Sequence, residues 1–260
     1  VGGSRKGVMA VTATVSENGL DLAVTGGKPA DGPLQMILAQ AAEAHRLARL
    51  SWDGEVIATR EPPVQRFGAA RVVPPPGAFL QATREGEAAL LQAVLQIIDG
   101  ATQVADLFAG CGTFSLPIAE HAAVLAVEGE REMTGALDRG WREAPGLKTV
   151  VTRTRDLFRQ PLLPDELEKF DAVVLDPPRA GAEAQIAELA RAQVPVIAYV
   201  SCNPVSFARD ARVLCDAGYR LNWVQVVDQF RWSAHVELAP VFSQKTEADG
   251  IFFKGSESFD

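Results

Sequence analysis

The sequence predicts an α/β protein, in which a smaller α+β domain precedes a mostly parallel sheet that ends in a C-terminal antiparallel hairpin. Apolar strand-like runs alternate with helical patterns between residues 84 and 216, which is typical of a parallel sheet covered on both faces. Two β-rich segments without a helix between them follow, and Pro74-Pro75-Pro76-Gly77 interrupts regular structure ahead of the alternation. We therefore expect domains at residues 1–76 and 77–242 and a tail at residues 243–260.

The first domain is predicted to be small and β-rich. The turn signal Glu17-Asn18-Gly19 lies between two alternating segments, and Asp31 is a candidate cap for a helix. The expected elements are strands at 8–15, 19–24, 55–59 and 67–73 and a helix at 34–50.

The second domain is predicted from regular alternation. A broad apolar face at Leu90, Leu91, Val94 and Leu95 indicates a helix at its start. The expected strands are 102–108, 123–127, 149–152, 170–175, 194–200, 220–227 and 234–242, and the expected helices are 84–98, 115–121, 131–144, 183–192 and 205–216.

Composition limits the protein class. A hydrophobic content of 47% and a charged content of 22% describe an ordinary globular protein, and the formal net charge of −8 argues against nucleic-acid binding driven by charge alone. Neither a membrane-length apolar run nor a leader is seen, so we expect a cytoplasmic monomer without membrane contact. The three cysteines form no CxxC pair, so we expect no metal in this chain, although an iron–sulfur cluster in an N-terminal segment outside it stays open.

A glycine-containing turn follows the strand that ends near Phe108. Gly110 and Gly112 allow a tight turn and close approach of a ligand, but the third glycine of a dinucleotide fingerprint is absent. This pattern favours S-adenosylmethionine, a cofactor without phosphate. Glu128, at the end of the next strand, is expected to bind the ribose, and Asp106 to meet the methionine end. The alternative is a glycine-rich turn that holds no ligand.

A second acidic loop follows the strand at residues 170–175. Two prolines make Asp176-Pro177-Pro178-Arg179 stiff, and the loop is expected over the ligand crevice at the carboxyl ends of the strands. A D-P-P loop also occurs in amino-group methyltransferases, where an aromatic residue follows rather than Arg179. The alternative is a proline-rich turn after a buried strand.

A cysteine stands between a strand and a helix in Ser201-Cys202-Asn203-Pro204. The N-terminus of a helix favours a thiolate, so Cys202 is a candidate nucleophile, while the alternative is a buried small residue. Glu237 and His235 lie in the segment His235-Val236-Glu237 near the last strand. By themselves, a carboxylate on a strand face is usually solvated and a histidine usually structural.

The glycine turn, D-P-P-R-A-G, S-C-N-P and H-V-E occur in this order over roughly residues 78–242. Together they resemble the catalytic domain of the RNA uracil-5-methyltransferase family, which makes 5-methyluridine in tRNA or ribosomal RNA. The resemblance implies a Rossmann-like class I methyltransferase domain, S-adenosyl-L-methionine as cofactor and an RNA partner. Residues 1–75 are similar to the family's central domain only in position and character.

The resemblance also implies roles for individual residues. Cys202 would add to C6 of uracil, and Glu237 would remove the C5 proton. The cofactor would be bound by Gln81, Phe108, Gly110, Gly112, Thr113, Glu128, Asp156 and Asp176. The target would be bound by Phe79, Asp176 and Arg179. Thr83 and Thr113 replace family asparagines, which changes the expected grip on the cofactor and leaves the chemistry intact.

The predicted function is methyl transfer to C5 of a uridine through a cysteine–C6 adduct. Two alternatives stay open. One is an amino-group methyltransferase that uses the D-P-P loop and leaves Cys202 and Glu237 idle. The other is an inactive cofactor-binding RNA module, which the acidic net charge would suit.

Overall fold

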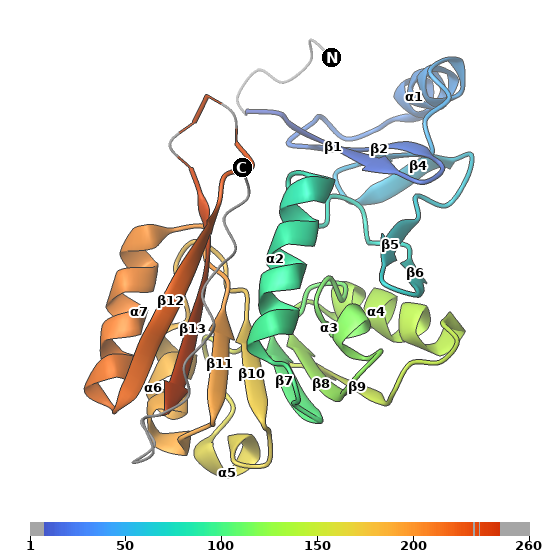
Figure 1. Cartoon of the computed structure of the whole chain (residues 1–260). Coiled ribbons are helices and arrows are strands. Elements are labelled where there is room, and N and C mark those ends of the chain that lie inside the picture. The colour runs from blue at the N-terminus through green and yellow to red at the C-terminus, as the bar shows by residue number, and fades with distance from the viewer. Residues whose placement is uncertain (1–7, 231, 234, 245–260) are drawn as a thin grey trace, which may run out of the picture.

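The larger part of the protein is built on a seven-stranded sheet (Figure 1). The computed structural model describes residues 8–230, 232–233 and 235–244. The strand order is β12-β13-β11-β10-β7-β8-β9. The strands are β7 (Gln103–Leu107), β8 (Ala123–Glu128), β9 (Val150–Thr154), β10 (Ala172–Leu175), β11 (Val196–Tyr199), β12 (Tyr219–Val227) and β13 (Glu237–Gln244). Five strands are parallel, and β13 runs antiparallel to β11 and β12, which confirms the predicted hairpin at the sheet edge.

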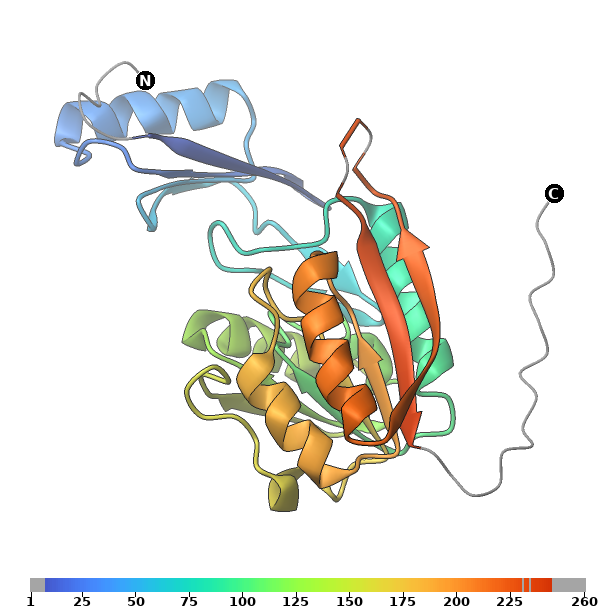
Figure 2. The ribbon, with the colours of Figure 1, turned by 90° about the vertical axis from the view of Figure 1, so that its left-hand side faces the viewer.

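Helices cover both faces of this sheet (Figure 2). One layer holds α2 (Arg84–Ile97), α3 (Ser115–Ile118) and α4 (Arg131–Glu143). The opposite layer holds α5 (Pro164–Leu167), α6 (Glu183–Ala192) and α7 (Pro204–Asp216). In β10, Val174 packs into the first layer and Val173 into the second. Because both faces of the strand are buried, its sequence is continuously apolar.

The first part of the chain forms a separate four-stranded sheet. Its strands, in the order β1-β2-β3-β4, are β1 (Ala10–Ser16), β2 (Gly19–Thr25), β3 (Arg49–Trp52) and β4 (Glu55–Thr59), and its helix is α1 (Gly32–Ala44). The prediction that the helix continues to Leu50 was wrong. Arg46 has a left-handed φ of 52°, and β3 is buried at all four residues, which one face of a helix does not allow. The Arg49 guanidinium is paired there with Asp21 at 2.6 Å.

A small hairpin replaces the single strand predicted at residues 67–73. Gly68, with a φ of 57°, separates β5 (Gln65–Phe67) from β6 (Ala70–Val72). Phe67 and Val72 are buried in the core of the larger sheet, so this hairpin packs with the second part of the chain. The domain boundary at residue 76 stays a prediction.

The C-terminal end of the sheet also differs in detail from the prediction. The last strand begins at Glu237 and ends at Gln244, so the first two residues of the predicted tail belong to β13. Residues 245–260 of that tail lie outside the described residues.

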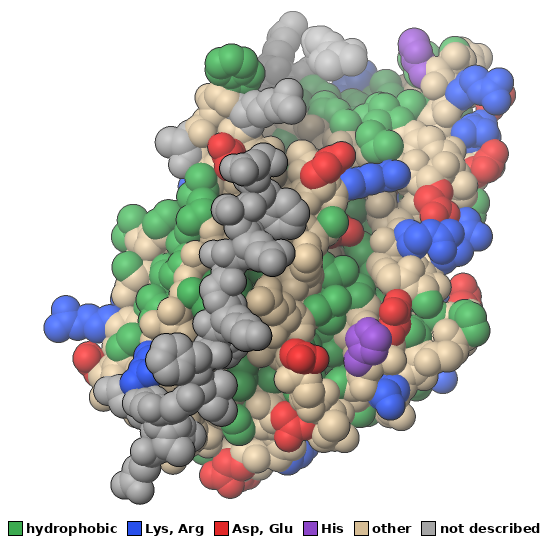
Figure 3. Space-filling view, in the orientation of Figure 1, with side chains coloured by type: hydrophobic (Ala, Val, Ile, Leu, Met, Phe, Trp, Pro, Cys, Tyr) green, Lys and Arg blue, Asp and Glu red, His purple; other side chains and the backbone are tan. Residues whose placement is uncertain are grey.

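The surface carries charges of both signs. On the face shown in Figure 3, Lys and Arg side chains are interspersed with Asp and Glu. In the described part of the chain, no helix has the length and apolar character needed to cross a bilayer.

Candidate active site

One pocket of about 590 Å³ lies at the carboxyl ends of the parallel strands. That volume suits a small-molecule site, for which about 300–1,000 Å³ is usual. The pocket is lined by Phe79, Leu80, Gln81, Phe108, Ala109, Gly110, Thr113, Phe114, Glu128, Gly129, Glu130, Met133, Asp156, Leu157, Phe158, Asp176, Pro177, Pro178, Arg179, Cys202 and Glu237. Among the residues that the sequence and the resemblance single out for catalysis or binding, Gly112 and Asp106 do not line it.

The two glycines after β7 do different work. Gly110 has a φ of 56°, and a Cβ there would meet only Met133 Cε at 3.9 Å, so this position stays open for a ligand. Gly112 has a φ of 102°, and a Cβ there would come within 2.8 Å of Leu116. Gly112 is therefore required by packing against α3. Cys111, between them, is buried, and desolvation raises its pKa to about 12, as suits a small residue that packs in the core.

Asp106 does not reach the pocket, contrary to the expectation that it meets the cofactor. Its side chain is fully buried and accepts a hydrogen bond from the Ser115 hydroxyl, while its Oδ1 has no partner. Burial is the main cause that raises the pKa of Asp106 to about 7. Asp106 therefore acts on the pocket through its charge from behind the glycine turn.

Glu128 is held in one orientation at the end of β8. Its Oε2 accepts the backbone N–H of Gly110 and its Oε1 that of Glu130, both at 3.0 Å. Each carboxylate oxygen keeps a free acceptor position, because it has two lone pairs and one is used. Those positions suit the two hydroxyls of a ribose.

Beyond β9, the pocket wall carries Asp156 and Phe158. Asp156 accepts the Phe158 N–H at 3.0 Å, and the Phe158 ring packs against Phe108 with centroids 5.4 Å apart. Phe108 has a left-handed φ of 64°, which is rare for an aromatic residue and points to a constrained site. Phe158 was missed by sequence reasoning, and its only signal was an aromatic residue shortly after a strand.

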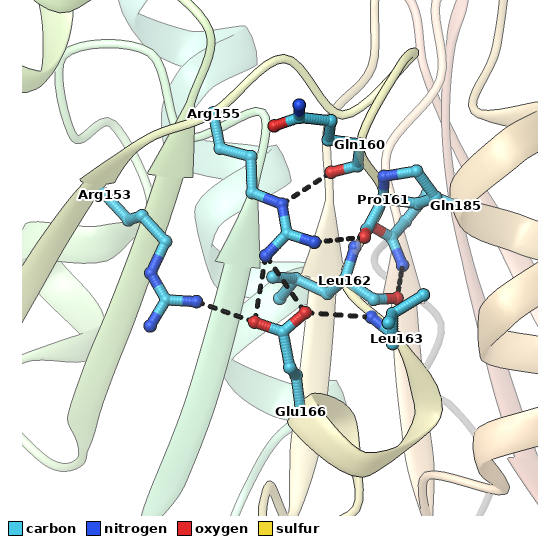
Figure 4. A network of polar contacts seen from close by, with 8 residues as sticks. All are labelled: Arg153, Arg155, Gln160, Pro161, Leu162, Leu163, Glu166 and Gln185. Carbon is cyan, nitrogen blue, oxygen red and sulfur yellow. Dashed lines mark hydrogen bonds and ion pairs between the residues drawn. The ribbon is translucent and has the colours of Figure 1, made fainter.

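A network of polar contacts fixes this wall from outside (Figure 4). Arg155 Nη1 lies 2.9 Å from both Glu166 oxygens, and Arg153 reaches the same carboxylate at 2.9 Å. Arg155 also donates to the carbonyls of Gln160 and Pro161. The hydrogen bond from Arg155 is the main cause that lowers the pKa of Glu166. These bonds join the two ends of the loop that carries Asp156 and Phe158.

Asp176 connects three elements at the other end of the pocket. Gln81 Nε2 donates to Asp176 Oδ2 at 3.3 Å, and Gln229 Nε2 donates to Gln81 Oε1 at 3.2 Å. Burial, together with the charges of Glu237 and Asp106, raises the pKa of Asp176 to about 8. Asp176 is consequently neutral in a large fraction of molecules at pH 7.

Cys202 and Glu237 face each other through the register of β11 and β13. Val196 pairs with Ser243 and Ala198 with Val241, and the isolated bridge between Ser201 and Leu238 continues that register. Continued by one position, that register would set Cys202 opposite Glu237, and both residues line the pocket. The charge of Glu237 raises the pKa of the Cys202 thiol, as expected of neighbouring side chains. A residue from each of two distant motifs thus enters the same pocket.

The S-C-N-P and D-P-P-R-A-G motifs are bonded to one another. Asn203 caps α7 by accepting the Val205 N–H, and its Nδ2 donates to the Arg179 carbonyl at 2.9 Å. Gly181 has a φ of 80°, and a Cβ there would come within 2.7 Å of Asp210 and Arg209. The glycine of the motif is therefore needed for packing on α7.

The electrostatics at Cys202 differ from the thiolate-favouring environment that we predicted. Cys202 is half-buried and precedes the cap of α7, so it lies outside the helical turn. Burial, Glu237 and Asp176 raise the pKa of the Cys202 thiol, while Arg179 lowers it. Burial also raises the pKa of Glu237, which is 3% exposed. Both groups therefore ionise less readily than exposed ones, and a positively charged ligand would favour their ionised forms.

This arrangement fits S-adenosylmethionine. Glu128 offers ribose acceptors, Phe108 and Phe158 offer an aromatic wall, and Gly110 leaves room beside the backbone. The carboxyls of Asp176 and Glu237 lie at the opposite end, and the buried Asp106 behind the pocket wall acts on Asp176 through its charge. Such a cluster favours a cationic sulfonium. In the described part of the chain, no group of three or more His, Cys, Asp and Glu side chains is arranged to hold a metal ion.

Comparisons with known proteins agree with this geometry. Residues 144–245 match the family described as tRNA (Uracil-5-)-methyltransferase. The chain is 48% identical over 239 residues to an uncharacterized RNA methyltransferase of Brucella suis, covering 92% of this chain and 57% of that protein. It is 38% identical over 177 residues to the 23S rRNA (uracil(1939)-C(5))-methyltransferase of Hahella chejuensis, covering 64% of this chain and 39% of that protein.

A solved structure shares the fold. The tRNA (uracil-54, C5)-methyltransferase of Pyrococcus abyssi, in complex with S-adenosyl-L-homocysteine, has a TM-score of 0.69 and 21% identity over 89% of this chain and 59% of that one. The predicted class I methyltransferase fold is thereby confirmed. The chain spans less than three fifths of the length of each of these three proteins.

Proposed function

The chain belongs to the RNA uracil-5-methyltransferase family, and on that premise we propose that it methylates C5 of a uridine in tRNA or rRNA through a covalent Cys202 adduct. The observation that carries the proposal is the β11–β13 register, which sets Cys202 opposite Glu237. Both residues line the pocket that contains Gly110, Glu128 and Asp176. The cofactor would supply an electrophilic methyl group.

Cys202 would start the reaction by adding to C6 of uracil. A bond forms between sulfur and C6, and the electrons of the C5–C6 double bond move toward O4, so that C5 becomes nucleophilic. This covalent route replaces one difficult step with easier ones. Cys202 would react as the thiolate, so its proton passes to solvent before the sulfur–C6 bond forms, and the raised pKa of the thiol makes this ionisation less favourable than for an exposed cysteine.

Asp176 would stabilise the negative charge on O4. Because its pKa is raised to about 8, the neutral carboxylic acid is available to donate a hydrogen bond at neutral pH. A donor aimed at developing charge in a partly dry site is one of the strongest catalytic devices. Gln81, bonded to Asp176 Oδ2, would hold that side chain in place.

Glu237 would finish the reaction as the base. Once C5 carries both a methyl group and a proton, Glu237 takes the proton, the C5–C6 double bond re-forms and the sulfur–C6 bond breaks. Burial raises the pKa of Glu237, which makes this carboxylate a stronger base than an exposed one.

The target uridine would leave its stack to enter the pocket. Phe79, whose side chain is 73% exposed at the rim, offers a ring on which the base can stack. Unstacking costs about a few kcal/mol, which such stacking offsets.

The test combines product analysis with trapping. RNA from cells that lack the gene is incubated with the protein and labelled S-adenosylmethionine, and we expect the label in 5-methyluridine. RNA that contains 5-fluorouridine should give a covalent adduct on a denaturing gel. A base can remove the C5 hydrogen of uridine as a proton, but it cannot remove a fluorine atom in the same place. Label in a methylated amino group would favour the D-P-P alternative. An absence of both label and adduct would favour an inactive module.

A further inference from the structure

The connection between β12 and β13 rises from the same edge of the sheet as the pocket. Because β13 is antiparallel to β11, its first residue lies beside the end of β11, where Cys202 follows. Both ribbon views show this connection projecting above the sheet on the side of the first domain (Figures 1 and 2). Its described residues are Asp228, Gln229, Phe230, Trp232, Ser233, His235 and Val236.

Trp232 in this connection is fully exposed, at 103% of its reference area. Its φ of 67° is left-handed, an uncommon conformation that is a genuine outlier for a bulky residue. Tryptophan buries a large area when it finds a partner, so a solvent-covered ring leaves that stabilisation unused. The position is therefore suited to a ligand that covers it.

The base of the connection is closed and bonded to the pocket. The rings of Phe230 and His235 are in contact, with centroids 6.2 Å apart, and the Ser233 N–H donates to the Phe230 carbonyl at 3.2 Å. Arg179 Nη2 lies 3.5 Å from His235 Nδ1. Three residues of chain reach about 10 Å at most, so Trp232 stays within that distance of His235.

A second exposed aromatic ring belongs to the lining of the pocket. Phe79 is 73% exposed, and its neighbour Gln81 is bonded to Gln229 of the connection at 3.2 Å. Phe79, Trp232 and Arg179 thus belong to segments that are bonded to one another, because Gln229 of the connection contacts Gln81 and His235 contacts Arg179. This is the composition of a single-strand binding surface, in which bases stack on aromatic side chains beside a cation.

Charge makes stacking more important in this chain than in a basic protein. The formal net charge is −8, and the face in Figure 3 carries no continuous run of Lys and Arg among its described residues. Nucleic-acid binding driven by charge alone is not favoured by this net charge. Stacking on an aromatic face does not depend on net charge.

We propose that Trp232 stacks on a nucleobase that flanks the target uridine, and that this contact holds the strand while the uridine enters the pocket. The proposal rests on the proposed function, since it assumes an RNA substrate. The ligand is a single-stranded RNA segment, recognised through the face of a base rather than its edge.

The experiment is a cycle of protein and RNA changes. A fluorescein-labelled single-stranded RNA with one uridine between adenosines is compared with the same RNA carrying abasic sites at the flanking positions. Binding of the wild type, Trp232→Ala, Trp232→Phe and the matched control Val151→Ala is measured by anisotropy. Val151 is 52% exposed on β9 at the far sheet edge, so its variant removes exposed apolar area away from the site.

We expect Trp232→Ala to weaken binding of the intact RNA by about ten- to a hundredfold and to leave binding of the abasic RNA unchanged. Trp232→Phe should retain most of the affinity, and Val151→Ala all of it. RNA should also quench an exposed tryptophan signal that Trp232→Phe lacks. Equal affinities of the wild type and Trp232→Ala for the intact RNA would overturn the proposal, as would equal losses on both RNAs.

The outcomes separate this proposal from the function itself. If Trp232→Ala binds RNA normally while the wild type still forms 5-methyluridine, only the stacking contact is refuted. If the wild type neither binds nor methylates RNA, both are refuted, and an exposed Trp232 then points to a protein partner.

Discussion

The two halves of the pocket differ in how the protein surrounds their acidic groups. In the half that contains Glu128 and Asp156, each carboxylate accepts backbone N–H groups, and the wall is braced by Arg155 and Glu166. In the half that contains Cys202, Asp176 and Glu237, burial is the main cause that raises all three pKa values, and the charge of Glu237 adds to the increase at Cys202 and Asp176. Under the proposed function, the first half would bind the cofactor and the second would carry the reaction.

The largest expected effect is at the reactive half. We predict that Cys202→Ala lowers methyl transfer by at least about 10⁴-fold, because the nucleophile is lost, while the dissociation constant for the cofactor changes by less than about twofold. Initial rates with labelled cofactor and calorimetric titration measure the two quantities. Cys215→Ala is the control, since Cys215 is exposed on α7. Full activity in Cys202→Ala would end the covalent scheme.

Glu237→Gln should separate the first steps from the last. We predict a loss of about 10²–10⁴-fold in turnover, with a covalent protein–RNA species accumulating because the C5 proton is no longer removed. A denaturing gel of the reaction with unmodified substrate RNA measures the adduct. Glu132→Gln, in the first turn of α4, is the isosteric control. If Glu237→Gln is slow but accumulates no adduct, another group removes the C5 proton.

The variant Asp176→Asn tests the raised pKa of the Asp176 carboxyl through its effect on the thermal stability of the protein. An acid whose native pKa is about 8 and whose unfolded pKa is near 4 binds more protons in the folded state between those values. Wild-type stability therefore falls as pH rises from about 4 to 8, since the slope follows the difference in bound protons. We expect Asp176→Asn to melt about 2–4 °C higher than the wild type at pH 8.5, with a smaller difference at pH 5.

The accompanying activity measurement tests the same comparison. Asp176→Asn should lose activity at every pH while its thermal stability improves. A melting temperature below that of the wild type at pH 8.5 would show that the ionised carboxylate of Asp176 does not destabilise the folded protein.

The smallest effect belongs to the binding half. We predict that Glu166→Ala raises the KM for the cofactor by about two- to tenfold with kcat unchanged, because the loop carrying Asp156 and Phe158 loses its brace. Asp138→Ala removes a comparable but exposed ion pair with Arg142 and should change neither parameter. A drop in kcat for Glu166→Ala would show that this half also shapes the reacting groups.

Much of the site could be predicted because its residues follow the ends of strands. Gly110, Glu128, Asp156, Asp176 and Cys202 each come shortly after a parallel strand, and parallel strands end at the same edge of a sheet. Phe158 and Trp232 could not be predicted in this way. Their significance depends on which surfaces other segments leave open, and no periodicity in the sequence reports that.

Some local patterns were overruled by packing. The helix predicted to continue through residues 45–50 ends early, and β3 forms beside β2, where the buried Arg49 is paired with Asp21 directly across the two strands. Gly112 looked like a ligand-binding glycine, but the side chain of Leu116 accounts for it.

The sequence alone determined the alternation of strands and helices in the second part of the chain, the chemistry-bearing motifs and the edge of the sheet where they gather, because these depend on local periodicity and on chain direction. Tertiary structure decided that Cys202 meets Glu237, that Asp176 holds a proton near neutral pH and that Trp232 stands uncovered. Each of those outcomes depends on pairing, burial or charge contributed by segments far apart in the chain, and such contributions exist only once the chain has folded.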